Sequence, residues 1–153
     1  MKRRDFIAAG GAAVASLAFE AKAQGGLAPP QDITPLIRKI TGGGAVEKGG
    51  VEIDLPQFAE NGNSVPMRIR VPSPMSAKDR VVEIHVFAAR NPRPHVATFH
   101  LGALAGRAEV STRVRLAGTQ DVTVLAALSG NRFRIAEAPI VVTSGACLDD
   151  GAL

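Results

Sequence analysis

Cys147 is the residue whose chemistry is hardest to explain as a purely structural role. It is the only cysteine among 153 residues and lies in the closing segment TSGACLDDGAL. A chain with one cysteine forms no internal disulfide, so this thiol pairs with another molecule, reacts with a substrate, or is incidental.

The segment around Cys147 predicts a thiol held away from the domain. The last strand is expected to end near Val142, and an extended chain from there carries the sulfur about 15 Å outward. Gly145 and Ala146 are small, and we expect them to make the C-terminal arm (residues 144–153) flexible. Such a thiol suits entry into the active site of another protein. The alternative is a spare cysteine on a frayed terminus.

The histidines do not predict a metal site. His100 follows His95 by five residues within one expected strand, which places them on opposite faces of a sheet. His85 is expected on the polar face of another strand. No pair has the spacing of metal ligands, so we predict neither a metal nor a cofactor.

A serine nucleophile is also not indicated. The segments LSGNR and TSGAC are not nucleophile elbows, and a β-sandwich lacks the strand-turn-helix context of that motif. We therefore expect a protein that is not an enzyme.

Alternation of apolar and polar residues predicts a β-rich domain over residues 51–143. In RAEVSTRVRL, residues 108, 110, 112, 114 and 116 form one face. Turn signals separate the expected strands, which lie at 51–55, 65–71, 82–88, 95–101, 107–116 and 121–128, followed by a pair broken around Pro139. About seven such strands favour an all-β, immunoglobulin-like β-sandwich.

The region before this domain, residues 24–50, predicts one short helix and a glycine-rich connection. Thr34 is a candidate N-cap, with Pro35 at the first helical position. Residues 42–50 hold five glycines and are expected to be a flexible connection rather than a nucleotide site.

Residues 1–23 predict an export signal. Arg3 and Arg4 precede an apolar run too short to span a bilayer, and Ala21-Lys22-Ala23 is a candidate cleavage site. The paired arginines favour twin-arginine export to the periplasm, with an ordinary secretory signal as the alternative. No cysteine follows the run, so we expect no lipid anchor and no stable membrane attachment.

Charge and composition argue against nucleic acid as a partner. Cleavage after Ala23 would lower the net charge from +4 to +2, and the chain has no Trp or Tyr for base stacking. The arginines at 107, 113 and 115 form a polar stripe. That stripe is expected to be either a solvated sheet face or a partner-binding surface.

Three segments resemble the SoxY family, the sulfur-carrier subunit of the periplasmic thiosulfate-oxidising Sox system. They are ENGNSVPMRIRVPSPM, NPRPHVATFHLGALAGRAEVSTRVRLAGTQDVTVLAALSG and the double-arginine leader. The resemblance covers nearly the whole chain. It implies an immunoglobulin-like carrier without enzymatic activity of its own, which pairs with a SoxZ subunit and holds sulfur intermediates on a C-terminal cysteine. Partner enzymes of the Sox type then attach and process the cargo.

The sequence departs from the resemblance around that cysteine. Family members typically end in Gly-Gly-Cys-Gly-Gly, whereas Cys147 here is followed by Leu148, Asp149 and Asp150. The two carboxylates are expected to raise the pKa of the thiol and to disfavour an anionic adduct. By position Cys147 maps to the carrier cysteine, and a disulfide-linked dimer through it is also expected. The alternative is a SoxY-like docking module of another periplasmic oxidation system, with altered or no sulfur cargo.

Overall fold

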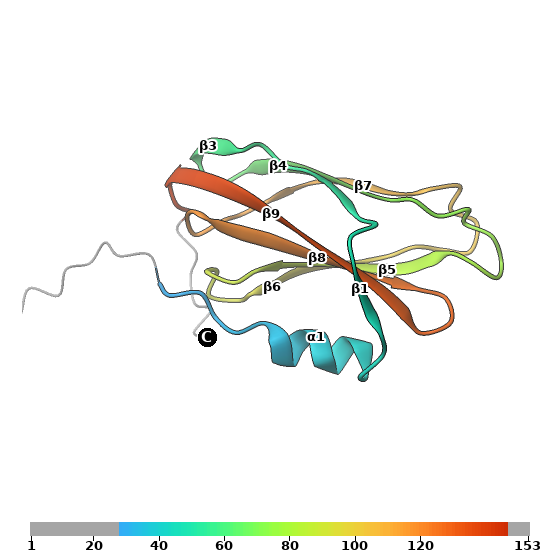
Figure 1. Cartoon of the computed structure of the whole chain (residues 1–153). Coiled ribbons are helices and arrows are strands. Elements are labelled where there is room, and N and C mark those ends of the chain that lie inside the picture. The colour runs from blue at the N-terminus through green and yellow to red at the C-terminus, as the bar shows by residue number, and fades with distance from the viewer. Residues whose placement is uncertain (1–27, 147–153) are drawn as a thin grey trace, which may run out of the picture.

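The computed structural model describes residues 28–146, which form a two-layered β-sandwich with one helix on its outside (Figure 1). The export signal predicted at residues 1–23 and Cys147 itself lie outside the described residues. The elements are α1 (Thr34–Thr41), β1 (Val46–Lys48), β2 (Glu52–Asp54), β3 (Phe58–Asn61), β4 (Val65–Val71), β5 (Val81–Ala88), β6 (His95–His100), β7 (Ala108–Val114), β8 (Gln120–Leu128) and β9 (Arg132–Ser144). The predicted all-β fold with a short helix is confirmed.

The two sheets differ in size. The larger has the order β1-β9-β8-β5-β6, with β3 also pairing with β9, and the smaller has the order β2-β4-β7. The strands β4, β5, β7 and β8 pair antiparallel with their neighbours, whereas β1 and β3 run parallel to β9. This arrangement leaves β6 and β7 as edge strands of the larger and the smaller sheet.

The core between the sheets comes from the predicted alternation. Val65, Met67, Ile69 and Val71 in β4 are buried while the residues between them are exposed. Ile84 and Val124 face them from the larger sheet. Strand patterning therefore identified the inward faces correctly.

Helix α1 covers part of the outer face of the larger sheet (Figure 1). Phe87, Leu125 and Phe133 form a second buried cluster there, against Leu36 and Ile37 of the helix. The β5 and β8 strands are consequently buried on both faces, as their near-continuous apolar sequence requires.

The start of α1 differs from the prediction. The capping position is Ile33, and no residue there caps the helix with its side chain. Instead Asp32 Oδ1 accepts a hydrogen bond from the Thr34 amide at 2.9 Å. Pro35 lies in the first turn, as the second helical residue and not the first as predicted.

Two expectations about strand continuity were wrong. The glycine-rich connection contains a strand, β1, because residues 46–48 pair with residues 133–135 of β9. In addition, β9 is unbroken at Pro139. Along the edge of β9, β1 ends opposite Ile135 and β3 begins opposite Val141, so Pro139 lies between these two partners. A residue without an amide hydrogen is tolerated where the ladder has such a gap.

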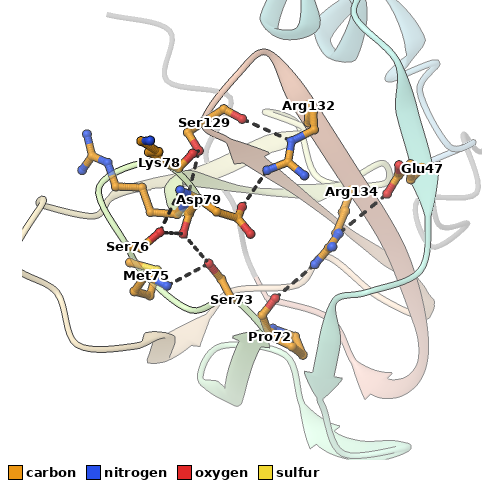
Figure 2. A network of polar contacts seen from close by, with 11 residues as sticks. Glu47, Pro72, Ser73, Met75, Ser76, Lys78, Asp79, Ser129, Arg132 and Arg134 are labelled. Atoms are coloured by element: carbon orange, nitrogen blue, oxygen red, sulfur yellow. Dashed lines mark hydrogen bonds and ion pairs between the residues drawn. The ribbon is translucent and has the colours of Figure 1, made fainter.

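A polar network fixes the start of β9, the end of the strand that lies away from the arm (Figure 2). Arg132 Nη2 contacts Asp79 Oδ1 at 2.6 Å, and Ser129 Oγ donates to the Lys78 carbonyl at 2.8 Å. Arg134 Nη1 donates to the Pro72 carbonyl at 3.1 Å. These contacts tie the loop between β4 and β5 to the β8–β9 turn.

Candidate functional site

We call residues 144–146 the root of the arm. They directly precede Cys147, the predicted carrier cysteine. Strand β9 ends at Ser144, two residues later than expected, and Gly145 and Ala146 are the last described residues. Ala146 is 8% exposed. The root is therefore packed against the sandwich.

Two backbone hydrogen bonds attach this root to segments far away in the sequence, and a third joins those two segments to each other. The Gly62 amide donates to the Ser144 carbonyl at 2.8 Å, and the Leu116 amide donates to the Gly62 carbonyl at 2.9 Å. The Ala146 amide then donates to the Leu116 carbonyl at 2.9 Å. The root is thus bound on both sides of Gly145.

Two glycines make this close approach possible. A Cβ atom on Gly62 would collide with the Leu116 carbonyl oxygen, and one on Gly145 would collide with the Ala117 carbonyl oxygen. Since backbone atoms are the obstacle, no side-chain rotation relieves the clash. Gly145 is required by this contact, which differs from the flexibility that we expected it to provide.

Asn91 holds the loop to which the root is attached. Its side chain is buried, donates from Nδ2 to the Arg115 carbonyl at 2.8 Å, and accepts at Oδ1 from the Ala117 amide at 2.9 Å. Gln120 Nε2 also donates to Asn91 Oδ1, at 3.2 Å. One buried amide group therefore fixes both sides of Leu116.

A further contact joins this loop to β9 just before the root. Thr119 Oγ1 accepts from the Val142 amide at 2.9 Å and donates to the Val142 carbonyl at 3.3 Å. The chain from Val142 to Ala146 is therefore attached at each end. The reach of about 15 Å that was expected from Val142 would require these hydrogen bonds to open.

The histidines form a hydrogen-bonded row on the outer face of β5 and β6. His100 Nδ1 and His85 Nε2 contact the two oxygens of Glu83, at 3.0 and 3.1 Å. On the other side of His85, its Nδ1 lies 3.1 Å from Thr98 Oγ1, which lies 3.0 Å from His95 Nε2. The ring centroids of His85 and His95 are 5.5 Å apart.

The expectation that His95 and His100 lie on opposite faces was wrong. Their strand has a bulge where the register shifts between Val86 and Phe87, so that Phe87 pairs with His95 rather than with residue 96. A bulge inserts one extra residue, which reverses the facing of everything beyond it. His95 and His100 consequently share one face.

His85 is buried in this row, and desolvation lowers its pKa, although the carboxylate of Glu83 acts in the opposite direction. A neutral ring that donates from Nε2 to Glu83 leaves Nδ1 to accept from the Thr98 hydroxyl. The row is therefore satisfied without a charge on His85.

Other kinds of site are not formed by the described residues. Among residues 28–146, no group of three or more His, Asp or Glu side chains is arranged to hold a metal ion. No helix within that range is long and apolar enough to cross a membrane.

Comparison with known families identifies the family of this chain. A family model described as "Sulfur oxidation protein SoxY" matches residues 37–147, a range that ends on Cys147. The chain belongs to the SoxY family. The chain departs from the expected glycine-flanked motif at Ala146, inside the match, and again from Leu148 onward, after its end.

Solved structures agree with this assignment of the SoxY fold. The sulfur carrier protein SoxY from Chlorobium limicola f thiosulfatophilum is 28% identical, with a TM-score of 0.59 over 71% of this chain and 94% of that one. Superoxide reductases share the fold at lower identity. The neelaredoxin of Ignicoccus hospitalis is 14% identical (TM-score 0.54, 61% and 80% covered), and the enzyme of Nanoarchaeum equitans is 10% identical (TM-score 0.52, 63% and 100% covered). No curated protein matches the sequence.

Proposed function

We propose that this SoxY-family protein carries sulfur intermediates covalently on Cys147 in periplasmic thiosulfate oxidation. The observation that carries the proposal is the family match, which extends through the only cysteine of the chain. The similarity to a solved sulfur carrier protein SoxY supports the same role.

In this proposal, partner enzymes catalyse the reactions, and this chain provides the cysteine sulfur to which the cargo is attached. A partner enzyme removes two electrons and one proton as the thiol sulfur bonds to the terminal sulfur of thiosulfate, which forms Cys147–S–S–SO₃⁻. Water then cleaves the sulfur–sulfonate bond. This step releases sulfate and a proton and leaves a persulfide on Cys147, which is oxidised further. In this scheme the chain is a substrate carrier and not an enzyme.

The root of the arm determines how partner enzymes reach Cys147. While Ala146 is bound to Leu116, the cysteine is held at one end of the sandwich. A partner enzyme must therefore approach that end, or the bonds of Ser144 and Ala146 must open. We propose that this opening, which breaks the backbone hydrogen bonds of Ser144 and Ala146, precedes entry into a narrow active site.

A SoxZ-like subunit is the proposed stable partner, and an exposed apolar pair offers it a surface near the root. Phe58 in β3 lies beside Val141 in β9, and their exposures are 56% and 52%. Large apolar side chains exposed side by side are typical of protein interfaces. A cavity of about 630 Å³ adjoins this pair, lined among others by Gln57, Pro139 and Val141.

The partner surface is tested by co-expression with the SoxZ-like chain. Phe58→Asp should abolish co-purification, whereas Leu104→Asp, at a residue that is fully exposed in a different loop, should leave it intact. Equal co-purification of both variants would place the interface elsewhere.

Cargo attachment is tested by mass spectrometry of protein isolated from the periplasm of thiosulfate-oxidising cells. Sulfur-containing adducts should map to Cys147 and disappear in Cys147→Ser, and recovery from the periplasm should require Arg3 and Arg4. An unmodified Cys147 under conditions that load a glycine-flanked SoxY protein contradicts the carrier role.

The docking-module alternative has two observations in its favour. The attached root shortens the reach of Cys147, and the Gly-Gly-Cys-Gly-Gly motif is absent. If Cys147→Ser supports thiosulfate oxidation in cells as well as the unmodified protein does, the sandwich acts by docking alone.

A further inference from the structure

A groove of about 510 Å³ lies between the two edge strands of the sandwich, β6 and β7. These strands bound the same open side, one from each sheet. The lining residues are Asn91, Pro92, Arg93, His95, Val96, Ala97, Thr112, Arg113, Val114 and Arg115. The groove therefore combines unpaired strand edges with basic side chains.

The charge of the groove is uncompensated within the described chain. Arg93, Arg113 and Arg115 are exposed, and the lining contains no Asp or Glu. None of the three forms an ion pair among residues 28–146. Arg113 donates from Nε to Ser64 Oγ at 2.7 Å, a neutral group that leaves its charge unbalanced.

Other arginines of the same sheet show the contrast. On β4, Arg68 lies 3.8 Å from Glu109, and Arg70 lies 3.7 Å from Glu109 and 3.8 Å from Glu52. Those charges are balanced by neighbours on β2 and β7. The groove between β6 and β7 is thus a local excess of positive charge rather than a property of the whole face.

The root of the arm is attached beside the groove, and the acidic residues Asp149 and Asp150 follow it in the sequence. Ala146 is hydrogen-bonded to Leu116, the residue after Arg115. Asp149 follows Ala146 by three residues, a span of at most about 11 Å, and Asp150 comes next. Both carboxylates are therefore tethered within reach of the Arg115 side chain.

We propose that the groove between β6 and β7 binds the segment Leu148–Asp150 of this chain through its arginines. The bound segment holds Cys147 between two attachments, Ala146 on one side and Asp149 on the other. Cys147 is released when salt or an acidic partner surface competes for the arginines. This docking does not depend on the sulfur-carrier role, since it requires only the groove and the two carboxylates.

Exposed ion pairs of this kind are modest and are screened by salt. Each pair changes the docking equilibrium by about two- to fivefold, so removing two arginines should reduce docking roughly tenfold. At about 1 M salt the Debye length falls to about 3 Å, which should release the segment.

The test is NMR of the full mature chain. In low salt, the {¹H}–¹⁵N heteronuclear NOEs of the Asp149 and Asp150 amides should approach those of β9. They should fall in Arg113→Gln/Arg115→Gln and at high salt. The matched control Arg68→Gln/Arg70→Gln removes two arginines from the neighbouring face and should leave these NOEs unchanged.

Reactivity of Cys147 provides a second readout. Alkylation by a neutral reagent should become faster in Arg113→Gln/Arg115→Gln, with no change in thermal stability. Low NOEs for Asp149 and Asp150 in the unmodified protein at low salt would overturn the proposal. Equal NOEs in the groove variant and its control would do so as well. The NOEs do not depend on cargo at Cys147, and alkylation is measured on reduced, unloaded protein, so both readouts are separate from the carrier role.

Discussion

The amide of Ala146 donates a hydrogen bond to the carbonyl of Leu116 at 2.9 Å, which fixes the residue that immediately precedes the only cysteine. The loop at Leu116 is itself held by Asn91. The chain that leads to Cys147 is therefore anchored by contacts between segments that are far apart in the sequence, and each of these contacts can be removed by a single substitution.

Gly145→Ala should detach the root of the arm. The added Cβ collides with the Ala117 carbonyl oxygen, so Ser144 and Ala146 cannot keep their backbone hydrogen bonds. Loss of these bonds should reduce the free energy of unfolding by about 1–3 kcal/mol and speed alkylation of Cys147. Urea unfolding and alkylation kinetics measure the two effects. Gly102→Ala is the control because its Cβ meets no atom within 4 Å. Identical alkylation rates for both variants would show that the root does not restrain Cys147.

Asn91→Ala should loosen the loop that receives the root. The substitution leaves the Ala117 amide and the Arg115 carbonyl without their buried partner. We expect the free energy of unfolding to fall by about 2–5 kcal/mol, because unsatisfied buried groups bear their full desolvation cost. Chemical denaturation measures this loss. Asn63→Ala, at an exposed asparagine, should change stability by less than about 0.5 kcal/mol. A loss below about 1 kcal/mol for Asn91→Ala would contradict the assigned role.

Stability should depend on pH through His85. Burial lowers the pKa of His85 below its ordinary value of 6.5, so below that pH the unfolded chain binds more protons than the folded protein. The free energy of unfolding should therefore decrease as pH falls from 6.5 toward the lowered folded-state pKa. Glu83, His95 and His100 are the charged and titratable side chains that face His85. Urea unfolding at about pH 7.5 and about pH 5.5 measures the change.

His85→Gln should remove most of this pH dependence, since an amide can still donate to Glu83 but does not titrate. His100→Gln is the control. Its side chain is 73% exposed, so the decrease below pH 6.5 should persist. An undiminished decrease in His85→Gln would assign the effect to other groups.

Arg132→Gln should leave the arm unaffected. Its contact with Asp79 belongs to the network at the far end of β9 (Figure 2) and is exposed. We expect a stability loss of less than about 1 kcal/mol and an unchanged alkylation rate of Cys147. A faster rate would mean that the whole of β9, rather than its last residues, controls the thiol.

The sandwich core and the helix could be predicted from the sequence because both depend on local periodicity. The alternation of Val65, Met67, Ile69 and Val71 identified the inward face of β4, and Pro35 with the following glycines marked α1. Cys147 stood out by composition alone. Its carrier role stays a proposal.

Several features of this protein depend on tertiary contacts that the local sequence pattern does not contain. One extra residue in β6 moved His95 onto the face of His100, and the gap between β1 and β3 allowed Pro139 within a strand. The buried side chain of Asn91 contacts a loop 24 residues away, which no local pattern indicates. Gly145 was assigned to flexibility, whereas the nearby Ala117 carbonyl is the reason for a glycine there. In each case the cause is the pairing of strands or a contact between separate segments, which exists only in the folded chain.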